Sequence, residues 1–296
     1  MGEKTGIAWC DATWNCWQGC HKVSAGCKNC YMFSEKTRYG QNPNVVIRSS
    51  DATFNAPLKW AKNPAKYGHI KRVFVDSWSD FFIEEADPWR AEAWEIMRNT
   101  PQFIYQLCTK RPERIAQCLP PDWGDGYPNV WLLTSTENQA AADLRIPILI
   151  KIPAVVHGIS AEPLLGPIDF RKVPTFNRIG LDLSDFWVIV GGESGSNARP
   201  MISSWADSIR QQCEKAGVAF FFKQNGEWVD AGHKEFGKHP SVPHKFLRSD
   251  GTEWPLGASE LENEDADVNT VVRIGRQTAA DTLYGKVYHE FPKVKI

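Results

Sequence analysis

Three cysteines stand close together near the start of the chain, in the segment CHKVSAGCKNC at residues 20–30. Cys20, Cys27 and Cys30 follow the spacing C-x6-C-x2-C, and Tyr31 comes directly after the last of them. Thiolates bind zinc and iron–sulfur clusters, so either cofactor would suit this loop. A thioredoxin-like redox pair and simple packing are the two other interpretations.

The four interpretations explain the loop unequally. A redox pair at Cys27 and Cys30 leaves Cys20 without a role. Packing does not suit a loop that is rich in Gly, Ser, Lys and Asn. A structural zinc ion normally has four ligands, which Cys10, Cys16 or His21 would have to complete. Three thiolates on a four-iron cluster leave one iron open for chemistry. The residues alone leave zinc and the cluster as competitors.

The composition describes an ordinary globular protein of 296 residues, with 42% hydrophobic and 23% charged residues. A formal net charge of −1 offers no support for general nucleic-acid binding. No segment reaches the roughly 20 apolar residues of a membrane helix, and the N-terminus lacks the features of a secretory signal. We therefore expect no membrane association and a cytoplasmic location, where thiols stay reduced and clustered cysteines favour metal binding.

The elements that must position the loop are visible as short apolar runs without polar alternation, which is typical of parallel strands buried on both faces. A strand near 11–14 and a helix at 31–39 flank the cysteines. Further strands are expected at 72–75, 103–108, 130–134, 155–160, 186–191 and 218–222, with helices at 87–99, 111–118, 137–145 and 203–216. This order predicts an α/β fold, with a partial or complete (β/α) TIM-like barrel over residues 1–222 and a mixed C-terminal extension over 223–296 that packs on it. A doubly wound sheet is the alternative.

Polar residues follow six successive predicted strands. Because the carboxyl ends of parallel strands converge on one face of a barrel, we expect these side chains to share a site. Each one alone could equally be a helix cap, a turn residue or an ion-pair partner. The polar residues are Ser77, Asp80, Lys110, Arg111, Ser135, Glu137, Glu162, Glu193 and Lys223, and Gly191 and Gly192 stand directly before Glu193.

The cysteine loop follows the first predicted strand and should therefore lie on that same face. A structural zinc ion has no need of that position, whereas a reactive cofactor does. The position of the loop therefore favours an iron–sulfur cluster.

A three-cysteine loop after the first strand of a partial barrel resembles the radical S-adenosylmethionine superfamily, although its usual spacing is C-x3-C-x2-C. The chain is also similar, from Thr5 to about Pro292, to an uncharacterised family found in bacteriophages, prophages and bacteria. The stretches that carry this similarity are ATWNCWQGCHKVSAGCKNCY, RVFVDSWSDFF, TKRPERI, WLLTSTENQ, SAEPLLGPI, WVIVGGESG and FFFKQNGEW.

The resemblance implies a 4Fe–4S cluster held by Cys20, Cys27 and Cys30, with S-adenosylmethionine bound at the open iron. The superfamily has an aromatic residue before the last cysteine. Here Asn29 stands there, and Tyr31 follows as the adenine contact. The resemblance places Ser77 and Asp80 at the methionine amino group, with Gly191, Gly192 and Glu193 as a second choice for it. Ser135 and Glu137 would contact ribose or carboxylate, and the carboxylates, Glu162 included, suit the cationic cofactor.

The resemblance further implies reductive cleavage of S-adenosylmethionine and abstraction of a hydrogen atom from a substrate. Lys110, Arg111 and Lys223 would suit a substrate that carries phosphate or carboxylate, such as a nucleotide or a nucleic-acid base. An electron donor such as flavodoxin or ferredoxin is the implied protein partner. The alternative function is a zinc-stabilised barrel with a binding or hydrolytic role.

Overall fold

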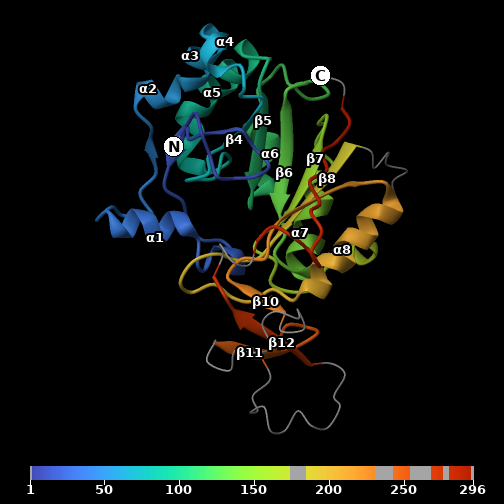
Figure 1. Cartoon of the computed structure of the whole chain (residues 1–296). Coiled ribbons are helices and arrows are strands. Elements are labelled where there is room, and N and C mark those ends of the chain that lie inside the picture. Colours follow the sequence, from blue (N-terminus) through green and yellow to red (C-terminus); the bar gives the residue numbers. More distant parts are fainter. Residues whose placement is uncertain (1, 174–184, 231–242, 254–267, 276–279, 295–296) are drawn as a thin grey trace.

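The computed structural model describes residues 2–173, 185–230, 243–253, 268–275 and 280–294. Seven parallel strands form one sheet, which curls into an open half-barrel in the order β1-β4-β5-β6-β7-β8-β9 (Figure 1). Within the described residues, β1 and β9 are the edges of this sheet and are not paired with each other. The strands are β1 (Ala12–Trp14), β4 (Arg72–Val75), β5 (Ile104–Thr109), β6 (Val130–Ser135), β7 (His157–Ala161), β8 (Phe186–Gly191) and β9 (Ala219–Gln224).

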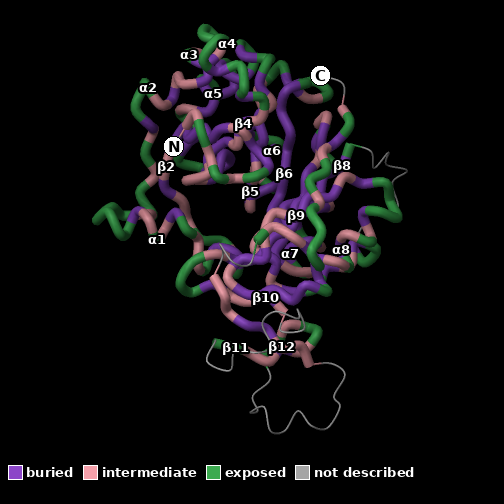
Figure 2. The backbone as a smooth tube through the Cα atoms, viewed as in Figure 1, coloured by how far each residue is buried: buried purple, intermediate pink, exposed green. Residues whose placement is uncertain are grey.

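The strands are where the apolar runs predicted them, because both faces of the sheet are covered. Every residue of β6 and β8 is buried. The burial colouring of Figure 2 shows the sheet as the buried centre of the molecule. β4 and β8 coincide with the predicted ranges 72–75 and 186–191. The α/β class and the parallel, curled sheet are confirmed.

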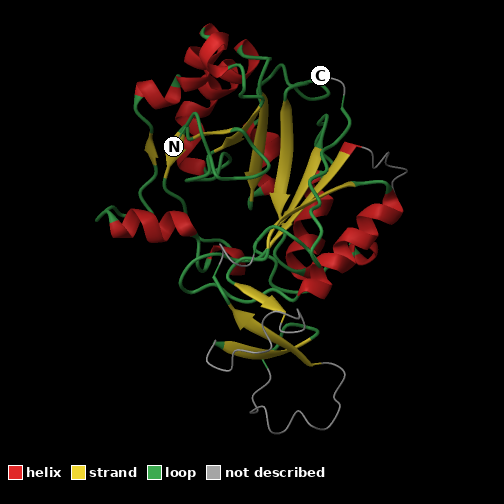
Figure 3. Ribbon diagram, viewed as in Figure 1, coloured by secondary structure: helices red, strands yellow, loops and turns green. Residues whose placement is uncertain are grey.

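Helices between the strands cover the outer face of the sheet (Figure 3). They are α5 (Asp87–Asn99), α6 (Pro112–Cys118), α7 (Gln139–Leu149) and α8 (Ser203–Ala216), whereas α1 (Tyr31–Arg38) stands apart from the sheet. α8 ends at Gly217, whose φ of 69° is the left-handed conformation that glycine adopts without strain. No helix of the described residues is long and apolar enough to cross a membrane.

The connection between β1 and β4 holds short elements that the apolar pattern did not predict. β2 (Trp17–Gln18) and β3 (Ile47–Arg48) pair in antiparallel fashion, and α2 (Asp51–Phe54), α3 (Ala56–Lys62) and α4 (Pro64–Tyr67) follow. This connection also holds the single 3₁₀ turn η1 (Ala25–Cys27), and the described residues have two more such turns further along the chain, η2 (Glu84–Ala86) and η3 (Phe170–Lys172). The cysteine loop therefore begins between β2 and η1.

After β9 the chain forms a second, antiparallel sheet with the order β10-β12-β11. Its strands are β10 (Trp228–Asp230), β11 (His244–Arg248) and β12 (Val268–Arg273), and they lie beyond the carboxyl ends of the parallel strands (Figure 1). The chain then returns along the edge strand β9. There the N–H of Phe222 donates to the carbonyl of Tyr288 (2.8 Å), and Phe291 packs with the aromatic residues inside the half-barrel.

Candidate functional site

The cysteine loop lies at the carboxyl end of the parallel sheet. Cys27 ends η1, and Cys30 immediately precedes α1. Cys27 is buried, Cys20 and Cys30 are partly exposed, and all eight cysteines of the chain are free thiols. Four sets of contacts hold this loop, each from a different strand of the sheet.

The first set comes from β4. The Asp76 carboxyl group, buried at the end of this strand, accepts hydrogen bonds from the backbone N–H groups of Cys16 (2.7 Å) and Trp17 (3.3 Å). The Gly19 N–H donates to the Trp78 carbonyl (3.0 Å). Gly19 has a φ of 101°, and a Cβ on it would lie 2.2 Å from the Val45 carbonyl oxygen, so only glycine fits. These contacts fix the backbone that leads into Cys20.

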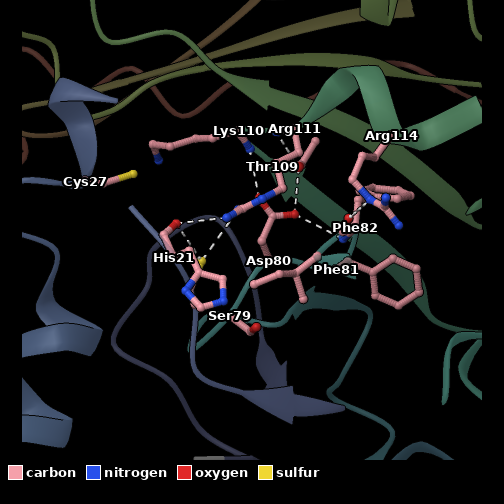
Figure 4. Close-up of polar contacts among 12 residues, drawn as sticks. His21, Cys27, Ser79, Asp80, Phe81, Phe82, Thr109, Lys110, Arg111 and Arg114 are labelled. Carbon is pink, nitrogen blue, oxygen red and sulfur yellow. Dashed lines mark hydrogen bonds and ion pairs between the residues drawn. The ribbon is translucent and has the colours of Figure 1, made fainter. Parts of the chain in front are cut away.

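The second set comes from the end of β5, where Arg111 lies between Asp80 and the cysteine loop (Figure 4). Its Nη1 is 3.0 Å from Asp80 Oδ2 and 3.6 Å from Cys20 Sγ, and its Nη2 donates to the His21 carbonyl (2.8 Å). Burial raises the pKa of the Cys20 thiol to about 12, and the Asp80 charge adds to this rise. The Arg111 charge and hydrogen bond act in the opposite direction and favour the thiolate.

The third set comes from Glu137, just after β6. Glu137 accepts the backbone N–H of Gly26 (3.1 Å) and pairs with Arg145 of α7 (2.8 Å). Burial opposes ionisation of Glu137. The contacts with Ser24, Arg145 and Gly26 outweigh burial and hold its pKa below the ordinary value. Glu137 therefore anchors η1 as a carboxylate.

The fourth set comes from Glu193, just after β8. Asn29, the residue before Cys30, donates to Glu193 Oε2 (3.0 Å) and to the Asn197 carbonyl (2.7 Å). Arg199 holds the same carboxylate through its Nε (2.9 Å) and its backbone N–H (2.8 Å). Burial opposes ionisation of Glu193, but the Arg199 and Asn29 contacts hold its pKa below the ordinary value.

The glycines of the Gly-Gly-Glu segment have a packing reason. A Cβ on Gly192 would lie 2.0 Å from the carbonyl oxygen of Asn225, so the end of β8 and the turn after β9 approach each other too closely for any side chain. The atoms nearest to a Cβ on Gly191 would belong to the Glu162 side chain, the first of them at 3.3 Å. Whether this segment also contacts a cofactor amino group stays a prediction.

Inside the mouth of the half-barrel, below the loop, lie polar side chains from several strands. The Lys110 Nζ donates to Ser135 Oγ (3.1 Å), and the Cys108 thiol lies 3.4 Å from the same hydroxyl. Lys223 and Glu162 form an ion pair whose side chains are 21% and 18% exposed. The Tyr31 hydroxyl donates to the Ser77 carbonyl and so joins α1 to the end of β4.

Two of the predicted ligands, Cys27 and Cys30, influence the charge of Lys110 in this mouth. Burial opposes the charge on Lys110, but its neighbours Cys108, Cys27, Cys30 and Glu137 raise its pKa. A negative charge on Cys27 would raise the pKa of the Cys20 thiol. Figure 4 shows the Lys110 side chain extending toward Cys27. In the part of the chain that the structure describes, no three His, Cys, Asp or Glu side chains are grouped so that they could hold a metal ion.

The predicted site residues therefore gather at one edge of the sheet, and most of the charged ones have a partner within the chain. Sequence reasoning missed three of these partners: Asn29, Arg145 and Arg199. Arg145 follows Glu137 by eight residues and Arg199 follows Glu193 by six, on segments whose direction only the tertiary structure sets. The ion pairs of the mouth are Asp80–Arg111, Glu137–Arg145, Glu162–Lys223 and Glu193–Arg199.

The fold and the site together define an α/β protein whose parallel half-barrel carries a three-cysteine loop at its carboxyl edge. In a comparison with known families, residues 4–292 of the chain match DUF5131, a family of proteins of unknown function. The chain belongs to that family. No curated protein and no solved structure matches the chain.

Proposed function

We propose that this protein is a radical S-adenosylmethionine enzyme built on a partial TIM-like barrel, with a 4Fe–4S cluster held by Cys20, Cys27 and Cys30. The observation that carries the proposal is the position of the three-cysteine loop. Contacts from the ends of four strands, β4, β5, β6 and β8, hold this loop at the carboxyl edge of a curled parallel sheet, which is where α/β barrels bind and transform their substrates.

The chemistry of the donor set fits such a cluster. Three thiols on one short loop are the ligand type that iron–sulfur clusters take, and each thiolate binds a separate iron, so the three sulfurs need not surround a single point. Lys110 and Arg111 place positive charge beside them. That charge compensates the negative charge of thiolates in a partly buried site.

When bound, the cluster would supply an electron for cleavage of a C–S bond of S-adenosylmethionine, and the adenosyl radical would take a hydrogen atom from the substrate. The chain's own residues would orient the cysteine loop and shield the site from water. Glu137 and Asn29 fix the loop at Gly26 and at the residue before Cys30. The half-barrel below is closed by packed aromatic side chains, which exclude water from the far end of the mouth.

Lys110 is the basic residue of the mouth best placed to bind an anionic group. Arg111 and Lys223 each form an ion pair with a carboxylate. Among the ion pairs of the described residues, none involves Lys110, whose ammonium contacts the Ser135 hydroxyl. We assign Lys110 to a carboxylate or phosphate of S-adenosylmethionine or of the substrate. A substrate with a phosphate, such as a nucleotide, would satisfy this assignment.

The test begins with anaerobic purification and reconstitution of the full chain. We expect a brown protein with broad absorption near 400 nm and about four irons per chain. After chemical reduction in the presence of S-adenosylmethionine, we expect 5′-deoxyadenosine by liquid chromatography. The matched control is Cys27→Ala, which should yield neither the iron nor the product.

Two outcomes would overturn the proposal. A colourless protein with one stoichiometric zinc ion would assign the cysteines a structural role. A full cluster without formation of 5′-deoxyadenosine would indicate electron transfer or a scaffold in place of radical chemistry.

A further inference from the structure

Arg111 is the one guanidinium in contact with a predicted cluster ligand among the hydrogen bonds of the described residues. Its Nη1 lies 3.6 Å from Cys20 Sγ, within the range of an N–H···S hydrogen bond. The Arg111 side chain is only 9% exposed, so this contact is shielded from solvent. A charged donor therefore faces a sulfur in a medium of low dielectric constant.

The guanidinium is held on both sides and has little freedom to turn. Nη1 also donates to Asp80 Oδ2 (3.0 Å), and Nη2 donates to the His21 carbonyl (2.8 Å). Asp80 is itself fixed, because its carboxylate accepts from the Thr109 hydroxyl (2.7 Å) and from the backbone N–H of Phe82 (3.0 Å). This arrangement aims Arg111 at the loop and not into the open mouth.

These contacts do not favour the substrate-binding role that the sequence suggested for Arg111. Both terminal nitrogens of the guanidinium already have partners inside the chain. Lys110, the preceding residue, extends into the mouth, where its ammonium donates to the Ser135 hydroxyl (3.1 Å). The adjacent residues Lys110 and Arg111 at the end of β5 thus point in different directions: Lys110 into the mouth and Arg111 toward the cysteine loop.

We propose that Arg111 sets the reduction potential of the cluster that Cys20 helps to bind, an inference that rests on the proposed function. Reduction adds an electron, and the extra negative charge is spread over the irons and sulfurs. A fixed cation and an N–H donor at one ligand sulfur stabilise the reduced state more than the oxidised state. Asp80 offsets part of the positive charge, while the hydrogen bond to sulfur remains. Arg111 therefore raises the potential and makes reduction of the cluster easier.

The experiment is a redox titration of the reconstituted full chain, followed by electron paramagnetic resonance in the absence of S-adenosylmethionine. Arg111→Met removes both charge and donor, and we expect its midpoint potential to shift to a more negative value than that of the wild type. Arg111→Lys keeps the charge and loses the planar fork, so its shift should be smaller and in the same direction.

The chain offers a matched control in Arg114, on the neighbouring helix α6. Its Nη2 lies 3.8 Å from the sulfur of Cys118, and it pairs with Asp87 (2.8 Å), so it reproduces an arginine–cysteine contact away from the loop. Figure 4 shows Arg114 on the far side of Asp80 from Cys27. Arg114→Met should leave the midpoint potential unchanged. A shift in Arg114→Met as large as that in Arg111→Met would show that the loss of any nearby arginine suffices, and would overturn the inference.

The remaining outcomes separate the two proposals. A wild-type chain that assembles no cluster overturns the proposed function, and the inference falls with it. A wild-type cluster whose potential is unchanged in Arg111→Met overturns the inference alone. Should Arg111→Met not retain a full complement of iron, Arg111→Lys decides: a negative shift supports the role of Arg111, and an unchanged potential contradicts it.

Discussion

The two ends of the half-barrel are built from different kinds of side chain. The amino end is filled by aromatic rings, among them Trp9, Trp131, Trp187 and Phe221, with Phe291 added from the C-terminal segment. The carboxyl end carries the cysteine loop and four ion pairs. Apolar burial supplies stability in proportion to area, whereas buried ion pairs contribute little net stability but fix positions. The amino end therefore stabilises the fold, and the carboxyl end holds a loop in place.

The largest expected effect is on iron content, and it should differ between a cysteine of the carboxyl end and a cysteine of the amino end. Cys27→Ala should reduce the iron content from about four atoms per chain to less than about one, because a cluster ligand is lost. Cys10→Ala, at the aromatic end where Cys10 is 6% exposed, should keep the full iron content. Iron and sulfide analysis after reconstitution, with circular dichroism to verify folding, makes the comparison. Equal iron contents in the two variants would refute the assignment of the loop.

The next largest effect is expected on the free energy of unfolding, from a substitution at the aromatic amino end. Trp187 is fully buried and contacts the rings of Trp9, Trp131 and Phe221. Trp187→Ala should lower the free energy of unfolding by about 3–5 kcal/mol, since a large cavity opens in the core. Lys110→Met, at the other end, should change it by no more than about 1 kcal/mol. Urea denaturation measures both, and a larger cost for Lys110→Met would contradict the division between the ends.

A smaller effect is expected from the two adjacent glycines at the carboxyl end. Gly192→Ala should destabilise the protein by roughly 1–3 kcal/mol, because the new Cβ would overlap the backbone of Asn225. Gly191→Ala should cost less, since the atoms nearest to its Cβ would belong to the Glu162 side chain, at 3.3 Å and beyond, and not to the backbone. Thermal unfolding of the two variants tests this, and an equal cost would show that close backbone approach is not what selects Gly192.

The smallest effect concerns an ion pair at the amino end. Asp11 accepts hydrogen bonds from the backbone N–H groups of Arg72 (2.8 Å) and Lys71 (3.1 Å) and also pairs with the Arg72 guanidinium. Burial opposes ionisation of Asp11, but these contacts hold its pKa below the ordinary value.

A lowered folded-state pKa means that the stabilisation is present above the unfolded pKa of about 3.9 and is lost as the pH falls through the folded value. Asp11→Asn should therefore cost about 1 kcal/mol or less at neutral pH, and nothing at the acid end of the range. Urea denaturation at several pH values checks this. A cost that grows toward low pH would reverse the sign and contradict the prediction.

Much of the fold could be predicted because the apolar runs are local signals. β4 and β8 match the predicted ranges, and α5 and α8 begin and end where expected, at 87–99 and 203–216. The elements between β1 and β4 and the antiparallel sheet after β9 could not be predicted in the same way. β2 and β3 have two residues each, too few for a periodic pattern to indicate them.

The sequence by itself determined which residues stand at the carboxyl ends of the strands, because strand ends follow from the apolar pattern, and it placed the three cysteines among them. Only the tertiary structure decided which partner each charged residue takes. Glu193 is 164 positions from Asn29, and Arg111 is 91 positions from Cys20, so no local pattern links them. Such contacts form because the curling of the sheet brings strand ends together, and curling depends on the packing of the whole chain.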